Sequence, residues 1–271
     1  LRKLKIDRFE DLVAALAMYR PGPLDSGMVD TYIECKHGRK KVSYPHPLLE
    51  NVLKETYGVI LYQEQVMQCA SVLAGYSLGE ADILRKAMGK KKVEVMQEQK
   101  IKFLAGAEKN KIEAKTAADI FDNIEKFAGY GFNKSHSAAY ALISYDTAWL
   151  KANFKVEFLA SYLSSQMKAK KEVLGHYVLE VRRSGIKVLP PDINSSRENF
   201  TPDGKVIRFG FGAVSRMGHN AIEMIVKERE TNGNFKSLWD FIERIDQSVI
   251  NKTAVENLIK AGAFDQLHKN R

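Results

Sequence analysis

The sequence predicts a mainly α-helical fold. Apolar side chains recur at the spacing of a helical face within residues 63–74. Ser77 and Glu80 stand three residues apart in the pattern of a capping box, which marks the start of another helix. Residues 137–174 contain neither proline nor glycine, as expected of one or two long helices. The chain has 271 residues, 45% of them hydrophobic, which is enough for one large or two medium domains.

The N-terminal elements are a helix, a loop and an apolar run. A capped helix is predicted from Asp7 to Ala17. The Arg-Pro-Gly-Pro sequence at residues 20–23 is predicted to be a rigid loop that presents Arg20, because proline lacks an amide donor and restricts the residue before it. Residues 57–62 form a short apolar run typical of a strand.

The next two helices each pair an apolar face with a polar one. The first covers residues 63–74 and ends at a glycine, and the second covers residues 81–88. Arg85 and Lys86 lie off the apolar face of the second helix. Two further helices are predicted over residues 93–104 and 116–127. The residues expected on the buried faces are Val66, Ala70 and Leu73 in the first helix and Ala81, Leu84 and Met88 in the second.

An aromatic turn with two glycines, at residues 127–136, precedes the long helical segment. It brings Lys134, Ser135 and His136 to a helix start, where free N–H groups and the helix dipole favour a phosphate. The alternative is an ordinary helix start capped by Ser135 or Ser137. The aromatic side chains expected to enter a core from the long segment are Tyr140, Trp149, Phe154 and Phe158.

The composition changes after Gly185. Residues 188–196 have loop chemistry, residues 201–204 read as a turn, and residues 206–209 alternate as a short strand does. Two helical pairs follow and resemble a tandem helix-hairpin-helix, whose amides hold DNA phosphates without reading bases. The predicted divisions are a first domain at 1–185, a linker with a short strand at 186–210, and the tandem helix-hairpin-helix at 211–271.

Positive charge is unevenly distributed. The net charge is +9, and residues 85–115 contain ten Lys and Arg against four Glu. Such a cluster is typical of a surface that meets nucleic acid or nucleotide phosphates, although a solvated helix face carries similar mixtures. No apolar run approaches a membrane span, so we expect a soluble protein. Two cysteines alone favour a reducing cytoplasm, and Leu1 in place of methionine indicates a piece of a longer polypeptide.

Motifs of other enzyme classes lack the context they need. Gly-Tyr-Ser-Leu-Gly at residues 75–79 matches the nucleophile elbow of serine hydrolases, but an elbow follows a strand and the preceding segment has helical periodicity. Residues 129–131 lack the third glycine of a dinucleotide loop, and Gly89 and Lys90 lack the rest of a P-loop. The histidines are scattered and Asp-x-Asp does not occur, so no metal cradle is predicted.

Several motifs together give a specific resemblance that covers essentially the whole chain in order. The first group resembles the fingers region of bacterial DNA polymerase III alpha subunits: Arg-Pro-Gly-Pro at 20–23, Tyr-Gly-Val-Ile-Leu-Tyr-Gln-Glu-Gln-Val-Met at 57–67, Leu-Arg-Lys-Ala-Met-Gly-Lys-Lys at 84–91, and residues 127–140. A second group, at residues 189–194, 209–213 and 260–265, resembles the part that follows the fingers. The resemblance implies a multi-helix fingers domain and then a small α/β-linked tandem helix-hairpin-helix domain.

The resemblance also implies a DNA-directed DNA polymerase of the C family. Its fingers close over the incoming deoxynucleoside triphosphate, while a palm expected before Leu1 holds the catalytic aspartates and Mg²⁺. On this basis we expect neither a catalytic residue nor a metal ligand in the chain. The residues expected at the nucleotide are Arg85, Lys86, Lys90, Lys91, Tyr130, Lys134, Ser135 and His136, with Phe132 an alternative to Tyr130 for packing on base or sugar. Those expected at the primer-template DNA are Arg20, Ser215, Arg216, Gly218 and His219.

One hairpin departs from the family pattern. Relatives generally have Gly-x-Gly there, whereas this chain has Arg216-Met217-Gly218. The expected function is nucleotidyl transfer by the full-length protein in the bacterial cytoplasm, with a sliding clamp and other replisome subunits as partners. This segment is expected to bind the triphosphate and the duplex, and to be inactive alone. The alternatives are a noncatalytic helix-hairpin-helix DNA-binding module and the hydrolase suggested by residues 75–79.

Overall fold

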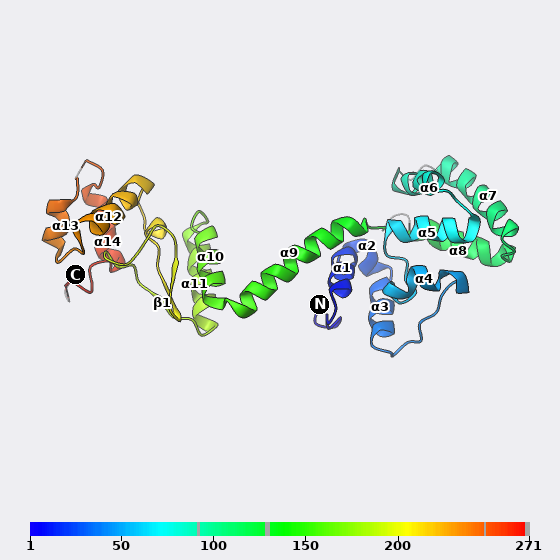
Figure 1. Ribbon diagram of the computed structural model, residues 1–271, viewed down its shortest axis with the longest axis horizontal. Coiled ribbons are helices and arrows are strands. Elements are labelled where there is room, and N and C mark those ends of the chain that lie inside the picture. Colours follow the sequence, from blue (N-terminus) through cyan, green and yellow to red (C-terminus); the bar gives the residue numbers. More distant parts are fainter. Residues whose placement is uncertain (91–92, 128–130, 247, 269–271) are drawn as a thin grey trace. The chain divides into compact units, whose positions relative to one another are not determined.

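The computed structural model confirms a mainly α-helical fold (Figure 1). It describes residues 1–90, 93–127, 131–246 and 248–268, without the side chains of residues 89, 90 and 93. The chain divides into two compact units, Leu1–Thr147 and Ala148–Arg271. The domain boundary proposed at residue 185 remains a prediction.

The first unit contains α1 to α8 and most of α9. The helices are α1 Phe9–Met18, α2 Pro21–Asp25, α3 Met28–Lys36, α4 Glu50–Leu53, α5 Gln63–Ala74, α6 Leu78–Lys90, α7 Val93–Lys109, α8 Ala114–Phe127 and α9 Lys134–Asn153. Short 3₁₀ turns lie at η1 Pro47–Leu49 and η2 Lys54–Thr56.

Helix α5 lies at the centre of the larger core in the first unit. Its face of Val66, Ala70 and Leu73 is fully buried, as predicted, and packs with buried side chains of α6, α7 and α8. Gly75 ends the helix in the left-handed conformation, with φ +70°. Helix α7 passes so close that a Cβ on Gly106 would stand 2.2 Å from the Ala74 carbonyl oxygen. The contact between α5 and α7 therefore requires glycine at that position.

A second core joins α1 and α3 to the segment that precedes α5. Leu61 and Tyr62 are buried with Val13 and Tyr32. The strand predicted over residues 57–62 is reduced, among the described residues, to one isolated bridge between Tyr62 and Phe132.

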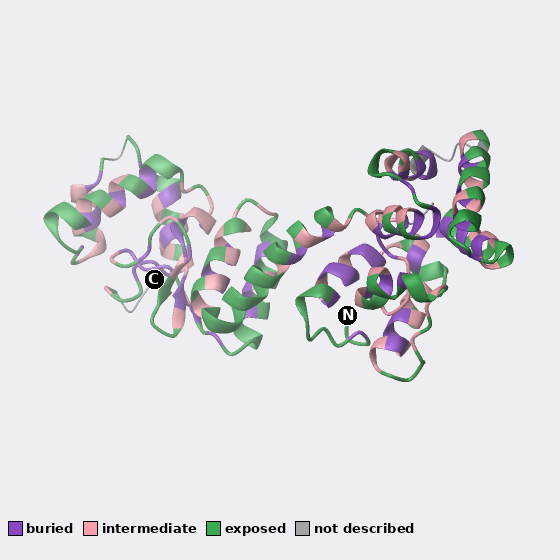
Figure 2. Ribbon diagram, turned by 45° about the vertical axis from the view of Figure 1, so that its right-hand side comes forward, coloured by how far each residue is buried: buried purple, intermediate pink, exposed green. Residues whose placement is uncertain are grey.

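Two predictions for the helices are wrong. The Arg-Pro-Gly-Pro sequence begins α2 instead of forming a loop, because a proline in the first turn of a helix loses no hydrogen bond. The aromatic side chains of the long segment do not all enter a core: Tyr140, Trp149 and Phe154 are 54%, 47% and 48% exposed. Most of α9 is exposed in Figure 2. A lack of proline and glycine predicts the helix but not which face is buried.

The second unit combines two helices and a small sheet with a helical C-terminal part. Its elements are α10 Lys155–Ser165, α11 Lys171–Arg183, β1 Val188–Leu189, β2 Thr201–Asp203, β3 Val206–Arg208, η3 Phe211–Ala213, α12 His219–Asn232, α13 Leu238–Arg244 and α14 Lys252–Ala261. The strand order is β1-β3-β2; β1 pairs parallel with β3, and β2 pairs antiparallel with it. The predicted strand is β3, whereas β2 was expected to be a turn.

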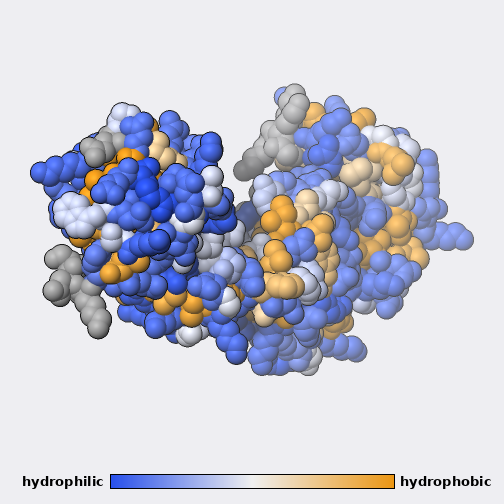
Figure 3. Space-filling view, turned by 60° about the vertical axis from the view of Figure 1, so that its left-hand side comes forward, coloured by the Kyte–Doolittle hydropathy of each residue, from blue (hydrophilic) through white to orange (hydrophobic). Residues whose placement is uncertain are grey.

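The second unit has two cores. Phe158 packs, as predicted, on the core shared by α10, α11 and the sheet. Phe211, Phe241 and Leu258 are fully buried in the other core, between η3, α13 and α14. On the face drawn in Figure 3, hydrophilic side chains predominate and hydrophobic ones form separate patches.

Candidate functional site

Helix α6 presents the two basic residues at which nucleotide binding is predicted. Its start has the predicted capping box, in which the Ser77 amide donates to Glu80 Oε2 over 2.8 Å and the Glu80 amide donates to Ser77 Oγ over 3.4 Å. Ala81 and Leu84 are fully buried against α5 and fix the rotation of the helix. Arg85 is therefore half-buried and Lys86 exposed, on the side predicted.

A single carboxylate binds both of these cations. Asp82 Oδ1 accepts from Arg85 Nε at 2.9 Å and lies 2.7 Å from Arg85 Nη2, and Asp82 Oδ2 lies 2.7 Å from Lys86 Nζ. The hydrogen bonds from Lys86 and Arg85 lower the pKa of Asp82. Asp82 is accordingly an anion that neutralises part of the positive charge of α6.

Gln63 connects Arg85 to the aromatic turn before α9. Its Oε1 accepts from Arg85 Nη1 at 3.4 Å, and its Nε2 donates to the Gly131 carbonyl at 3.3 Å. The backbone amide of Gln63 also donates to the Phe132 carbonyl at 2.9 Å. A Cβ on Gly131 would lie 2.9 Å from the Phe127 ring and 3.2 Å from Gln63 Cγ, so a larger residue there would force these side chains to shift.

The start of α9 is capped from within the chain. Asn133 Oδ1 accepts from the His136 amide at 2.8 Å, so the cap is Asn133 and the prediction of Ser135 or Ser137 is wrong. Glu64 accepts from the Lys134 amide at 3.0 and 3.2 Å. The first amide of the helix therefore already binds a carboxylate, as expected from the positive end of a helix dipole.

The side chains around this helix start combine charge with aromatic surface. Lys134 Nζ lies 2.7 Å from Glu55 Oε2. The guanidinium carbon of Arg20 lies 4.3 Å from the centre of the Phe132 ring, and the Arg20 Nε donates to the Ala17 carbonyl. The His136 ring is 5.5 Å from the ring of Phe132. Partial burial lowers the pKa of Arg20.

The first unit thus brings several predicted residues to one place. Arg85 and the turn share Gln63, and Arg20 and His136 share Phe132. Arg20, which stays a predicted DNA-binding residue, lies against Phe132, and Ser135 is exposed. The predictions for the Lys90 side chain, Lys91 and Tyr130 lie outside the described residues.

The second unit contains the hairpin predicted to bind DNA. It joins η3 to α12, and Arg216 has φ +65°, the left-handed conformation that favours glycine. The Asn257 side-chain amide of α14 donates to the Ser215 carbonyl at 2.9 Å and holds the hairpin in place. Arg216 and Gly218 are exposed, and His219 Nδ1 lies 2.9 Å from Glu198 Oε2.

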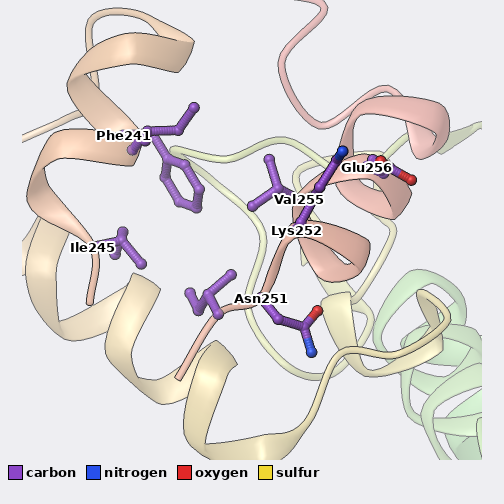
Figure 4. Close-up of a pocket in the computed structure, with 8 residues that line it drawn as sticks. Phe241, Ile245, Asn251, Lys252, Val255 and Glu256 are labelled. Carbon is purple, nitrogen blue, oxygen red and sulfur yellow. The ribbon is translucent and has the colours of Figure 1, made fainter. Parts of the chain in front are cut away.

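A pocket of about 370 Å³ lies in the second helical pair, between α13 and α14. Figure 4 shows Phe241 and Ile245 on one side and Val255 opposite them. Lys252 and Glu256 add charge to an otherwise largely apolar lining.

Across the described part of the chain, histidine, cysteine and carboxylate side chains form no group of three or more able to hold a metal ion. Among the same residues, no helix has the length and apolar character needed to cross a membrane.

Comparisons with known proteins identify the family of this chain. Residues 1–111 match the bacterial DNA polymerase III alpha subunit finger domain, and residues 185–271 match the helix-hairpin-helix motif. This chain is a finger and helix-hairpin-helix segment of the DNA polymerase III alpha type. The resemblance inferred from the sequence is thereby confirmed.

The relatives of this polymerase segment are longer proteins. DNA polymerase III subunit alpha of Caulobacter vibrioides is 51% identical over 271 residues, which cover 100% of this chain and 23% of that protein. The Escherichia coli K12 subunit is 51% identical over 278 residues, with 100% and 24% covered. For Pseudomonas aeruginosa PAO1 the identity is 51%, with 98% and 23% covered. The finger and hairpin segment thus spans about a quarter of these relatives.

Sequence reasoning missed the residues that hold the basic groups of the finger segment. Asp82 stands three and four residues before Arg85 and Lys86, a spacing typical of helical ion pairs, so the pattern was visible. Gln63 and Glu64 meet their partners across about seventy residues of chain, with separations of 68 and 70. Such contacts leave no local signal.

Proposed function

We propose that the first unit binds the incoming deoxynucleoside triphosphate of a DNA-directed DNA polymerase. The observation that carries this proposal is the Gln63 side chain, which joins Arg85 on α6 to Gly131 in the aromatic turn. The two basic elements predicted to bind nucleotide therefore belong to one local structure. Lys86 follows Arg85 on α6 and Lys134 begins α9, so each element contributes a further basic side chain.

The proposed site suits a triphosphate chemically. The Arg85 guanidinium offers a planar fork of donors that matches phosphate oxygens, and lysine ammonium groups add point charges. Phe132, with Arg20 against its ring, offers an aromatic surface for base or sugar. In nucleotidyl transfer, negative charge grows on the reacting phosphate and the pyrophosphate that leaves it, so positioned cations lower the barrier.

The catalytic step is assigned to another part of the polymerase. Asp82, Glu55 and Glu64 are each bound to basic or amide groups, and the described residues do not fit a metal site. We therefore assign the catalytic carboxylates and Mg²⁺, which neutralises phosphate charge when bound, to residues outside this chain. The segment alone is proposed to be inactive.

The second unit is proposed to hold the primer-template duplex. The match to a helix-hairpin-helix motif and the exposed Arg216 support contact with DNA phosphates. Such contacts are independent of base sequence, which a replicative polymerase needs. In this proposal the full-length protein works in the bacterial cytoplasm with a sliding clamp and other replisome subunits.

Replacing Arg85 tests the nucleotide site in the full-length polymerase. Losing charge-assisted hydrogen bonds to phosphate is expected to raise the Kd for dATP roughly 10-fold or more in Arg85→Ala, on a primer-template with a chain-terminated primer. Lys134→Ala is expected to have a smaller effect in the same direction. The matched control is Arg39→Ala, which removes an arginine of the same unit that pairs with Glu34.

The outcome separates the proposal from its alternative. If Arg85→Ala and Lys134→Ala both bind dATP as the parent does, the nucleotide site is wrong. A helix-hairpin-helix protein without catalytic function would bind DNA with no dependence on dATP in any of these variants.

A further inference from the structure

Arg85, Lys86 and Lys134, three basic side chains of the proposed nucleotide site, are each bound by a carboxylate of the same unit. Asp82 on α6 binds Arg85 and Lys86, and Glu55 in η2 binds Lys134. Glu64 on α5 binds the first amide of α9. These three carboxylates thus bind the groups that are proposed to bind phosphate.

Asp82 differs from the two glutamates because it binds two of the cations proposed to bind phosphate, whereas Glu55 binds one of them and Glu64 binds amide groups. Glu64 also accepts from the Asn133 side chain at 2.9 Å, so it holds the helix cap as well. The two oxygens of Asp82 are divided, one facing Arg85 and the other facing Lys86. A single carboxylate thus satisfies both cations.

The pairing is accessible and can be exchanged. The side chains of Asp82 and Arg85 are each 33% exposed, and that of Lys86 is 61% exposed. Ion pairs with this much solvent contact contribute little to stability, so an incoming anion displaces the carboxylate at small cost. Because Asp82 lies one turn before its partners, it stays close after displacement and can bind them again.

We propose that Asp82 is an internal competitor for phosphate that weakens retention of pyrophosphate after nucleotide transfer. This inference rests on the proposed function of the site. A triphosphate must replace Asp82 on Arg85 and Lys86, so its apparent affinity is its intrinsic affinity multiplied by the fraction of molecules in which the carboxylate has released them. Once pyrophosphate has formed, Asp82 competes for the same two cations and promotes its release.

The test uses the full-length polymerase with Asp82→Asn, which keeps the shape of the side chain and removes its charge. We expect the inhibition constant of pyrophosphate and the Kd for dATP to fall by a similar factor, roughly 2- to 10-fold. Binding of deoxyadenosine, which has no phosphate, is expected to stay unchanged. Glu34→Gln is the matched control, because it breaks an exposed carboxylate–arginine pair with Arg39.

A second substitution makes the outcomes distinct. In an Arg85→Ala background, Asp82→Asn is expected to lose most of its effect on dATP and pyrophosphate binding, since one of the two cations for which Asp82 competes is gone. If neither Arg85→Ala nor Lys134→Ala weakens dATP binding, the proposed nucleotide site is wrong. If Arg85→Ala weakens dATP binding while Asp82→Asn leaves pyrophosphate inhibition unchanged or weakens it, Asp82 positions Arg85 and does not compete with phosphate. Equal thermal midpoints establish that each variant is folded.

Discussion

At the scale of single residues, the first unit contains a buried ion pair. Asp11 on α1 is fully buried and lies 2.7 Å from Lys36 Nζ, whose side chain is 4% exposed. The Tyr32 hydroxyl donates to Asp11 over 3.4 Å, and Arg8 approaches it at 3.3 Å. Each charge is therefore compensated within the core that joins α1 to α3.

Asp11→Asn is expected to destabilise this chain strongly. The substitution keeps the volume but leaves Lys36 as a nearly buried cation without its buried partner, which costs about 3 kcal/mol of unfolding free energy. Urea denaturation at pH 7 measures the loss. A change no larger than that of Glu34→Gln, in an exposed pair, would contradict this account.

The same carboxylate predicts how stability depends on pH. Burial acts to raise the pKa of Asp11, but the hydrogen bonds from Lys36 and Arg8 outweigh it and lower the pKa below the ordinary value. The unfolded chain therefore binds this proton more readily than the folded chain does. The contribution of Asp11 is present above pH of about 4 and is lost as the pH falls through the folded pKa. Asp11→Asn should flatten the acid limb of a stability curve accordingly.

At the scale of elements, local signals in the sequence predict where helices begin and end better than they predict which side chains the helices bury. The capping box of Ser77 and the glycine after α5 predict helix ends that the structure confirms. The predicted cap of α9 was wrong because Asn133, Ser135 and Ser137 are all residues that cap helices, and the sequence does not show that the Asn133 side chain is the one used. The prediction that the aromatic residues of α9 are buried was wrong because aromatic residues alone do not show which face of a helix meets a core.

The sequence predicts the cations of the candidate site but not the carboxylates that bind them. Arg85 and Lys134 stand out by charge and motif, whereas Glu55 acquires its role only when folding brings it within 2.7 Å of Lys134. Gln63 is similar, since its amide joins elements that only the tertiary fold brings together. Sequence patterns report local structure, and these contacts depend on packing.

The hairpin before α12 allows a stability prediction. Arg216 adopts φ +65°, which costs a residue with a Cβ about 1 to 2 kcal/mol relative to glycine. Part of this is offset by the greater freedom of glycine in the unfolded chain, so Arg216→Gly should stabilise the second unit by up to about 1 kcal/mol. Arg216→Val should destabilise it, because a β-branched side chain tolerates this region poorly. Urea denaturation of the three chains checks the order.

At the scale of the whole molecule, two units with separate cores are proposed to perform two tasks. In this proposal the first unit binds the nucleotide through Arg85 and Lys134, and the second unit binds the duplex through Arg216. Because the chain spans about a quarter of its relatives, both tasks are best measured in the full-length polymerase. The division implies that the two activities respond to different substitutions.

Arg216→Gly tests this division because it removes a charge while relieving backbone strain. In the full-length polymerase we expect weaker primer-template binding and a plot of log affinity against log salt whose slope is smaller by about 0.9, the value for one lost phosphate contact. The Kd for dATP should not change, and Arg216→Lys should retain the salt slope. Arg85→Ala should show the reverse pattern, with nucleotide binding weakened and the slope preserved. A hairpin variant that loses dATP affinity but keeps its DNA affinity would show that the two units do not divide the work in this way.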